Sequence, residues 1–190
     1  MNPTSSQFTF AGGTILLALA LSLSAPGAEE TPAGERWFTA CNIWYEQPEK
    51  VWSTNYQKGS ILPAGSEVAH IRRSGEAITF VDVKTNVKFT VLFVAKHHPG
   101  ENADSIADRL FSHKGFEDLV AGFTQDEIEA IKSGEIRNGM SKKAVLIARG
   151  HPPEIRTRST DLDIWVYWYD RFRYHSIQFA DGKLVSTGKT

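Results

Sequence analysis

Cys41 has the widest chemical range of any residue in this sequence, because a thiolate can attack a carbonyl, bind a metal or accept a lipid. It is the single cysteine among 190 residues, so it can form neither an internal disulfide nor a multi-thiolate zinc site. The sequence predicts no cation or helix N-terminus beside it that would lower the pKa of its thiol. We expect a buried free cysteine in a strand, and a thiol hydrolase using Cys41 is an alternative hypothesis.

Three histidines form a second candidate group. His97 and His98 are adjacent at the end of a predicted strand, and His70 lies on a strand expected to pair with it. Adjacent residues of a strand point to opposite faces, so His97 and His98 cannot easily share one ion within the strand. We expect structural histidines and no cofactor. The alternative is a periplasmic small-ligand or metal-binding module built around His70, His97 and His98.

Aromatic and basic residues near the C-terminus are a stronger indication of binding. Large amphipathic rings and arginines are enriched at interaction surfaces. We predict a partner-binding site on the exposed face or edge of the C-terminal sheet, at Trp165, Tyr167, Tyr169, Arg171 and Arg173. The alternative for each ring is packing within the core. Further aromatic and basic residues of the same kind are Trp44, Tyr45, Trp52, Tyr56, Trp168, Phe172, Tyr174, Arg156 and Arg158.

The sequence contains no recognisable catalytic motif. Gly-x-Ser-x-Gly, His-Glu-x-x-His and a phosphate-binding loop are all missing, so we expect a protein that is not an enzyme. The formal net charge of −1 excludes bulk attraction to nucleic acid. That charge is uneven, with a net of −5 over residues 29–134 and +4 over residues 135–190. The basic part suits an acidic envelope protein or anionic lipid head groups, or it attracts the acidic part of the same chain.

The N-terminus is typical of a secretory signal peptide. Residues 1–28 have no charged side chain, and an apolar run over residues 14–23 is followed by small residues. We predict cleavage near Gly27 or Ala28. The apolar run is about half the length that a bilayer span needs, so we expect a soluble periplasmic or exported chain without a transmembrane span. A charged segment separates the run from Cys41, and a lipid anchor there is not expected.

Three regions are predicted after the leader, and together they give an α+β fold. Residues 37–98 carry short aromatic and β-branched runs separated by turns such as Ser74-Gly75, which predicts a small SH3-like β-barrel domain. Residues 99–123 are predicted to be an acidic helical linker. Residues 124–188 are predicted to form an α+β domain, in which Thr124 and Ser141 begin helices and Asp181-Gly182 turns a final hairpin.

An ordered set of motifs runs through the last third of the chain. The motifs are Ile136-Arg137-Asn138-Gly139-Met140-Ser141, Gly150-His151-Pro152-Pro153, Trp165-Val166-Tyr167 and Phe179-Ala180-Asp181-Gly182-Lys183. Through them residues 125–188 resemble the SmpA/OmlA family, the small lipoprotein of the outer-membrane β-barrel assembly machine and its relatives. The resemblance implies two helices packed on a three-stranded antiparallel sheet. It also implies a non-catalytic scaffold or partner-binding role in the cell envelope, among outer-membrane assembly components.

Overall fold

The computed structural model describes residues 1 and 35–189. The predicted cleavage site at Gly27 or Ala28 and the apolar run before it lie outside the described residues. The predicted α+β class is confirmed: four α-helices accompany a six-stranded mixed sheet, a separate three-stranded antiparallel sheet and a two-stranded ribbon in the described part of the chain. Within residues 35–189, not one helix is both long enough and apolar enough to cross a membrane.

The six-stranded sheet belongs to the first half of the chain. Its strands, in order across the sheet, are β3 (Val51–Trp52), β7 (Val87–Leu92), β6 (Ala77–Asp82), β5 (Glu67–Arg73), β1 (Trp37–Thr39) and β8 (Phe111–Ser112). All neighbours are antiparallel except β3 and β7. The ribbon pairs β2 (Ile43–Tyr45) with β4 (Ser60–Leu62). Short 3-10 helices lie at η1 (Pro48–Lys50) and η2 (Ala95–His97).

Alternation along the central strands creates the first hydrophobic core. In β6, Ile78 and Phe80 are buried while the residues between them are only partly covered, as expected where one face of a sheet packs inward. Phe80 stacks on Phe89 of β7, with 5.2 Å between ring centroids, and meets Phe111 of β8 edge-on. These rings join the central strands to β8 at the edge of the same sheet.

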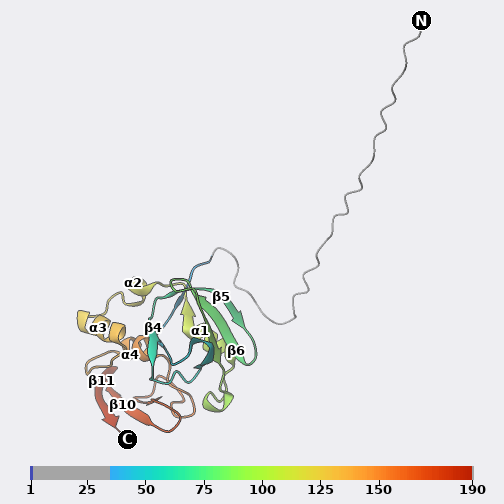
Figure 1. Cartoon of the computed structure of the whole chain (residues 1–190). Helices are drawn as coiled ribbons and strands as arrows, with labels where there is room; N and C mark the ends of the chain where they lie inside the picture. The colour runs from blue at the N-terminus through green and yellow to red at the C-terminus, as the bar shows by residue number, and fades with distance from the viewer. Residues whose placement is uncertain (2–34, 190) are drawn as a thin grey trace.

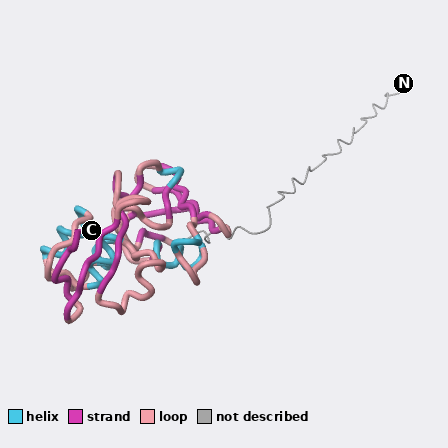
Figure 2. The backbone as a smooth tube through the Cα atoms, turned by 90° about the horizontal axis from the view of Figure 1, so that it is seen from below, coloured by secondary structure: helices cyan, strands magenta, loops and turns pink. Residues whose placement is uncertain are grey.

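The second half builds a separate layer of helices on strands (Figures 1 and 2). Helices α3 (Gln125–Ser133) and α4 (Lys142–Arg149) share one core with the sheet β11 (Lys183–Lys189), β10 (Tyr174–Ala180) and β9 (Ile164–Trp168). The capping box at Thr124 and Glu127 and the N-cap at Ser141 form as predicted. The final hairpin also forms, with positive φ at both Asp181 and Gly182, as a type I′ turn requires.

Residues 99–123 are divided between the two cores. Helix α1 (Ala103–Leu110) buries Ala103, Ile106 and Ala107 in the first core. The short helix α2 (Phe116–Leu119) and the residue after it place Leu119 and Val120 in the second core. The predicted acidic helical linker does contain two helices. Its apolar residues are not exposed as in a simple linker, because they pack into both cores.

The end of helix α4 joins the two halves. An α-helix leaves its last four carbonyls without partners inside the helix, and in α4 these are the carbonyls of residues 146–149. The first of them, Leu146 O, accepts from the backbone N–H of Gly150 at 2.8 Å. Asn42 takes the next two, since its backbone N–H donates to Ile147 O and its Nδ2 to Ala148 O, at 2.9 and 3.1 Å. The last carbonyl, on Arg149, accepts from Nδ2 of Asn55 and Nε2 of Gln57, at 2.9 and 3.1 Å.

Asn42 is the centre of this joint. Its Nδ2 also donates to Ile131 O at the end of α3, at 2.7 Å, and its Oδ1 accepts from the backbone of Ala64, at 2.8 Å. Asn42 is 1% exposed. One side chain therefore satisfies three backbone groups that water cannot reach. Removing it would leave those buried groups without a partner, which lowers the stability of the fold.

We predict that Asn42→Ala destabilises the protein strongly. The substitution leaves a backbone N–H and two carbonyls without their side-chain partner, which should lower the free energy of unfolding by about 3 kcal/mol. Urea unfolding followed by tryptophan fluorescence measures this change. Asn138→Ala, at an exposed asparagine, is the matched control and should change the free energy by less than about 0.5 kcal/mol. Equal effects of the two variants would contradict the assigned role of Asn42.

Candidate functional site

A large cleft lies where the two halves meet. It has a volume of about 1040 Å³ and takes one wall from residues 46–97 and the other from residues 155–172. The lining residues are aromatic, basic, acidic and aliphatic: Trp52, Tyr56, His97, Trp168, Phe172, Lys58, Lys96, Arg156, Arg171, Glu46, Asp170, Val94 and Ile155. We call this the aromatic-basic cleft.

Hydrogen bonds and ring contacts hold the two walls together. The backbone N–H of Gln57 donates to Trp168 O at 2.9 Å, and that of Ile155 donates to His97 O at 3.1 Å. The His97 ring stacks on Trp168, with 5.3 Å between centroids, while its Nδ1 lies 2.8 Å from Thr54 Oγ1. Burial, with the charge of Lys96 nearby, lowers the pKa of His97, so the imidazole is neutral at pH 7. Gln57 binds both the end of α4 and the backbone of Trp168, so the joint at α4 is directly connected to the wall of the cleft.

The turn between β9 and β10 presents two side chains to the cleft. Asp170 Oδ1 accepts from the backbone N–H groups of Phe172 and Arg173, both at 2.9 Å, and these bonds together with the Arg173 guanidinium lower the pKa of its carboxyl group. Arg173 Nε donates to the other oxygen, at 2.9 Å. Fixed in this way, the turn exposes Arg171 and Phe172, whose side chain is 76% exposed.

The cleft has an excess of unpaired positive charge. Its two acidic residues are both engaged, because Glu46 pairs with Lys58 at 2.6 Å and Asp170 pairs with Arg173 at 2.8 Å. The three remaining lining cations are Lys96, Arg156 and Arg171, and none of them forms an ion pair within the described residues. The two arginines instead lie over aromatic rings, Arg156 over Tyr174 and Arg171 over Phe172, at 5.1 and 4.6 Å from the centroids.

Two of the predicted binding residues are in the core, and the prediction is wrong for them. Trp165 and Tyr167 are 0% and 2% exposed, because the face of β9 that carries them is covered by α3 and α4. Both polar atoms are used internally: Trp165 Nε1 donates to Leu162 O and the Tyr167 hydroxyl to Gly150 O, each at 2.8 Å. Neither side chain can contact a partner in this fold.

The other three predicted residues lie at the surface. Tyr169 is 43% exposed at the end of β9 and packs against His175, with 5.0 Å between ring centroids. Arg171 lines the cleft, whereas Arg173 is exposed but holds Asp170. The structure thus places Arg171 in the cleft and the other two next to it. Binding by any of the three remains a prediction.

The predicted histidine group does not come together. His70 is exposed at a bulge in β5 and has a φ of 54°. His97 bonds to Thr54, and His98 Nδ1 lies 2.6 Å from Glu154 Oε2. No three His, Cys, Asp or Glu side chains within residues 35–189 are arranged to hold a metal ion. The structure therefore does not bring His70, His97 and His98 together as one set of metal ligands.

Cys41 is not an accessible nucleophile. It is 4% exposed, and burial raises the pKa of its thiol to about 12, so the sulfur is protonated and shielded. His98 and His151 line the same small cavity of about 20 Å³. Burial and the charge of Arg109 lower the pKa of His151 to about 4, so its neutral ring offers no positive charge to stabilise a thiolate. The thiol-hydrolase alternative lacks both an exposed sulfur and an activating group.

A partly buried ionic network includes His98 and Arg109, which line this cavity. Arg109 bonds to both Glu101 and Glu154, and Glu154 also accepts from His98. Burial acts to raise the pKa of Glu154, but the hydrogen bonds from His98 and Arg109 outweigh it and lower the pKa to about 2. Each of these groups is bonded to another member of the network, so we assign the network a structural role.

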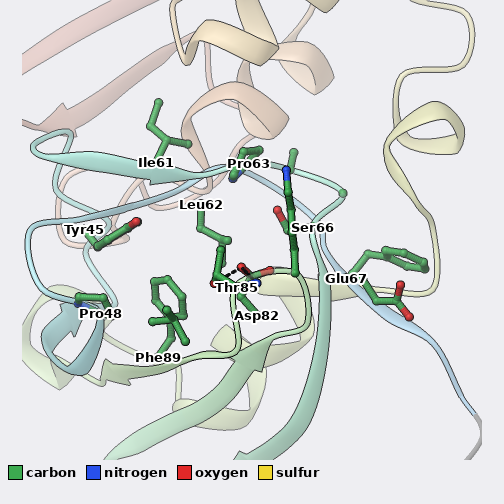
Figure 3. Close-up of a pocket in the computed structure, with 15 residues that line it drawn as sticks. Tyr45, Pro48, Ile61, Leu62, Pro63, Ser66, Glu67, Asp82, Thr85 and Phe89 are labelled. Carbon is green, nitrogen blue, oxygen red and sulfur yellow. Dashed lines mark hydrogen bonds between the residues drawn. The ribbon is translucent and has the colours of Figure 1, made fainter.

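A second, more apolar pocket lies within the first half, between the β2–β4 ribbon and the six-stranded sheet (Figure 3). It has a volume of about 650 Å³. Sequence reasoning missed this pocket, because its wall combines strand and turn residues from several segments between residues 38 and 89 that meet only in the folded chain. It is also separate from the aromatic-basic cleft, with which it shares no lining residue.

Comparisons with models of known protein families, with curated proteins and with solved structures found no match to this chain. The function proposed below therefore rests on the geometry of this chain.

We predict that Cys41 reacts with a thiol-specific disulfide reagent only when the protein unfolds. Its burial and its raised pKa both block attack by the sulfur. In native buffer the labelling rate should match the global unfolding rate and should rise with urea in parallel with it. Rapid labelling of the folded protein at neutral pH would contradict the burial of this thiol.

We predict that acidification weakens the fold between about pH 6.5 and pH 4. Burial lowers the pKa of His151 and of His175 to about 4, helped by Arg109 and Arg149 respectively. The unfolded chain therefore binds more protons than the native state in this range, and the free energy of unfolding falls as the pH falls. Urea unfolding at pH 7 and pH 4.5 measures the loss.

The double variant His151→Gln/His175→Gln should lose less stability over the same interval than the wild type. His113→Gln, at an exposed histidine, is the control and should keep the wild-type dependence. An unchanged pH dependence in the double variant would show that other groups are responsible.

Proposed function

We propose that this chain is a non-catalytic, exported envelope protein that binds an acidic, aromatic-containing segment of a partner protein in the aromatic-basic cleft. The single observation that carries the proposal is the set of three cleft cations without an acidic partner, Lys96, Arg156 and Arg171, beside exposed rings. Charge complementarity of this kind directs partner choice and speeds association.

The rings of the cleft support a peptide as the occupant. Trp52 and Phe172 are 39% and 76% exposed. The rings of Tyr56, His97 and Trp168 contact one another in the wall of the cleft. Tryptophan, tyrosine and arginine are the residues that most often dominate binding energy at protein interfaces. An extended acidic segment would place carboxylates on the arginines and apolar side chains on the rings.

The C-terminal architecture supports an envelope role. Helices α3 and α4 on a three-stranded antiparallel sheet agree with the fold that the SmpA/OmlA resemblance implies, and that resemblance favours partners among outer-membrane assembly components. The same proposal includes a signal peptide over residues 1–28, a periplasmic location and an SH3-like shape for residues 37–98.

We predict that charge reversal in the cleft weakens this binding. The probe is a fluorescently labelled peptide of alternating Glu and Tyr residues, and the measurement is its anisotropy with the mature protein at several salt concentrations. Arg156→Glu/Arg171→Glu should weaken binding at least about tenfold and reduce its salt dependence. The matched control is Lys88→Glu/Lys114→Glu, which makes the same change in net charge at exposed residues outside the cleft and should bind as the wild type.

Equal binding by the two double variants would contradict the proposed site. Anionic lipid head groups are the competing ligand, and co-sedimentation with vesicles containing anionic lipid tests them. Vesicle binding that depends on Arg156 and Arg171, without peptide binding, would replace the protein partner with a membrane surface.

A further inference from the structure

We propose that the pocket beneath the β2–β4 ribbon is a second binding site, which takes a small molecule with an apolar body and one protonated amine. The amine would lie on the carboxylate of Asp82 and the apolar body against the surrounding rings and aliphatic side chains. This site is independent of the aromatic-basic cleft and of the function proposed for it.

The walls of the pocket suit an apolar body. Figure 3 shows Tyr45, Pro48 and Phe89 on one side, with Leu62 and Ile61 above. Phe89 and Leu62 are 2% and 6% exposed, and Tyr45 meets Phe89 edge-on at 5.1 Å between centroids. A volume of about 650 Å³ is typical of sites for small molecules, which are mostly apolar with a few polar groups that fix orientation.

Asp82 supplies the polar group. It ends strand β6 and is 4% exposed. Figure 3 shows it between the ring wall and the segment formed by Ser66 and the start of β5 at Glu67. Its Oδ2 accepts from the backbone N–H and the hydroxyl of Thr85. Its Oδ1 has no hydrogen-bond partner within the described residues, although Asp82 lines the pocket. A carboxylate with one free oxygen in the wall of a pocket favours a charged donor.

The other charged groups of the pocket leave this carboxylate unmatched. Both oxygens of Glu67 are taken by Arg36, at 3.0 and 2.8 Å, so Glu67 is already neutralised. Among the described residues, Lys84 is the one cation that lines the pocket, and it is exposed and forms no ion pair with Asp82 there. The hydroxyl of Ser66 makes no hydrogen bond within the described part of the chain and is free to accept a second N–H from the amine.

This charge pattern selects a cation over an anion or a neutral group. A ligand carboxylate would be repelled by the Asp82 carboxylate, because like charges in one pocket repel each other. A ligand hydroxyl could donate to Oδ1, but a neutral donor makes a weaker hydrogen bond to a carboxylate than an ammonium group does. The tyrosine and phenylalanine faces also favour a nearby cation.

The test compares three probes of the same shape with the mature protein: 2-phenylethylammonium, 2-phenylethanol and 3-phenylpropanoate. Isothermal titration calorimetry measures affinity, and saturation-transfer NMR confirms contact of the phenyl ring. We expect the ammonium probe to bind at least about tenfold more tightly than the alcohol, and the carboxylate probe not to bind. Equal affinity for the three probes, or no binding of the ammonium probe at millimolar concentration, would overturn the proposal.

Variants separate the charge of Asp82 from its role in the turn. Asp82→Asn should weaken the ammonium probe at least about tenfold and leave the alcohol nearly unchanged. Thr85→Val removes the hydroxyl bond to Asp82 but keeps the charge, so it should retain binding. Val87→Trp, at a 36% exposed lining residue, should block the pocket without removing a buried group. Wild-type affinity in both Asp82→Asn and Val87→Trp would place the probe elsewhere.

Arg156→Glu/Arg171→Glu is the control for the cleft and should bind the ammonium probe as the wild type does. Loss of probe binding in that variant would show that the amine occupies the aromatic-basic cleft, which would overturn the assignment to Asp82.

Discussion

The carbonyl end of helix α4 is the constraint on which the rest of this structure depends. A helix that ends inside a protein needs donors for its last carbonyls, because water cannot reach them. Here the donors come from a segment about a hundred residues earlier in the chain, at Asn42, Asn55 and Gln57. Asn42 also serves the end of α3. The second half of the chain therefore cannot complete its helices without the first.

The same joint explains why the cleft has its shape. Gln57 binds the Arg149 carbonyl with its amide nitrogen and the Arg149 guanidinium with Oε1, the latter at 2.6 Å, while its backbone N–H holds the end of β9. Burial lowers the pKa of Arg149, which lies over the Trp44 ring at 5.6 Å. The turn after β9 that carries Arg171 is thereby fixed against the wall formed by Tyr56 and His97. A binding surface made by two halves requires this kind of rigid contact.

Local structure could be predicted from the sequence, because its causes are local. The capping oxygens of Thr124 and Ser141 and the positive-φ pair at Asp181-Gly182 lie within a few residues of the structures they determine. The alternation of β9 could be predicted in the same way. Which of its faces is covered depends on α3 and α4, so the sequence predicts surface positions for Trp165 and Tyr167 although they are core residues.

The joint and the cleft could not be predicted from the sequence. Asn42, Asn55 and Gln57 are ordinary polar residues in a strand-rich segment, and no local pattern distinguishes a buried asparagine from an exposed one. Trp52, Tyr56, Trp168 and Phe172 were noticed as aromatic residues, but they come from segments that meet only in the folded chain. The sequence did contain one usable signal, since Arg171 was selected for its position beside aromatic residues and does line the cleft.

Native-state hydrogen exchange tests most directly the central claim that the two halves are one cooperative unit. Amides of β6 in the first core and of β10 in the second should exchange with the same opening free energy, and with the same dependence on denaturant, because α4 cannot keep its end capped once the first half unfolds. Two distinct opening free energies, with β10 still protected after β6 has opened, would contradict the account.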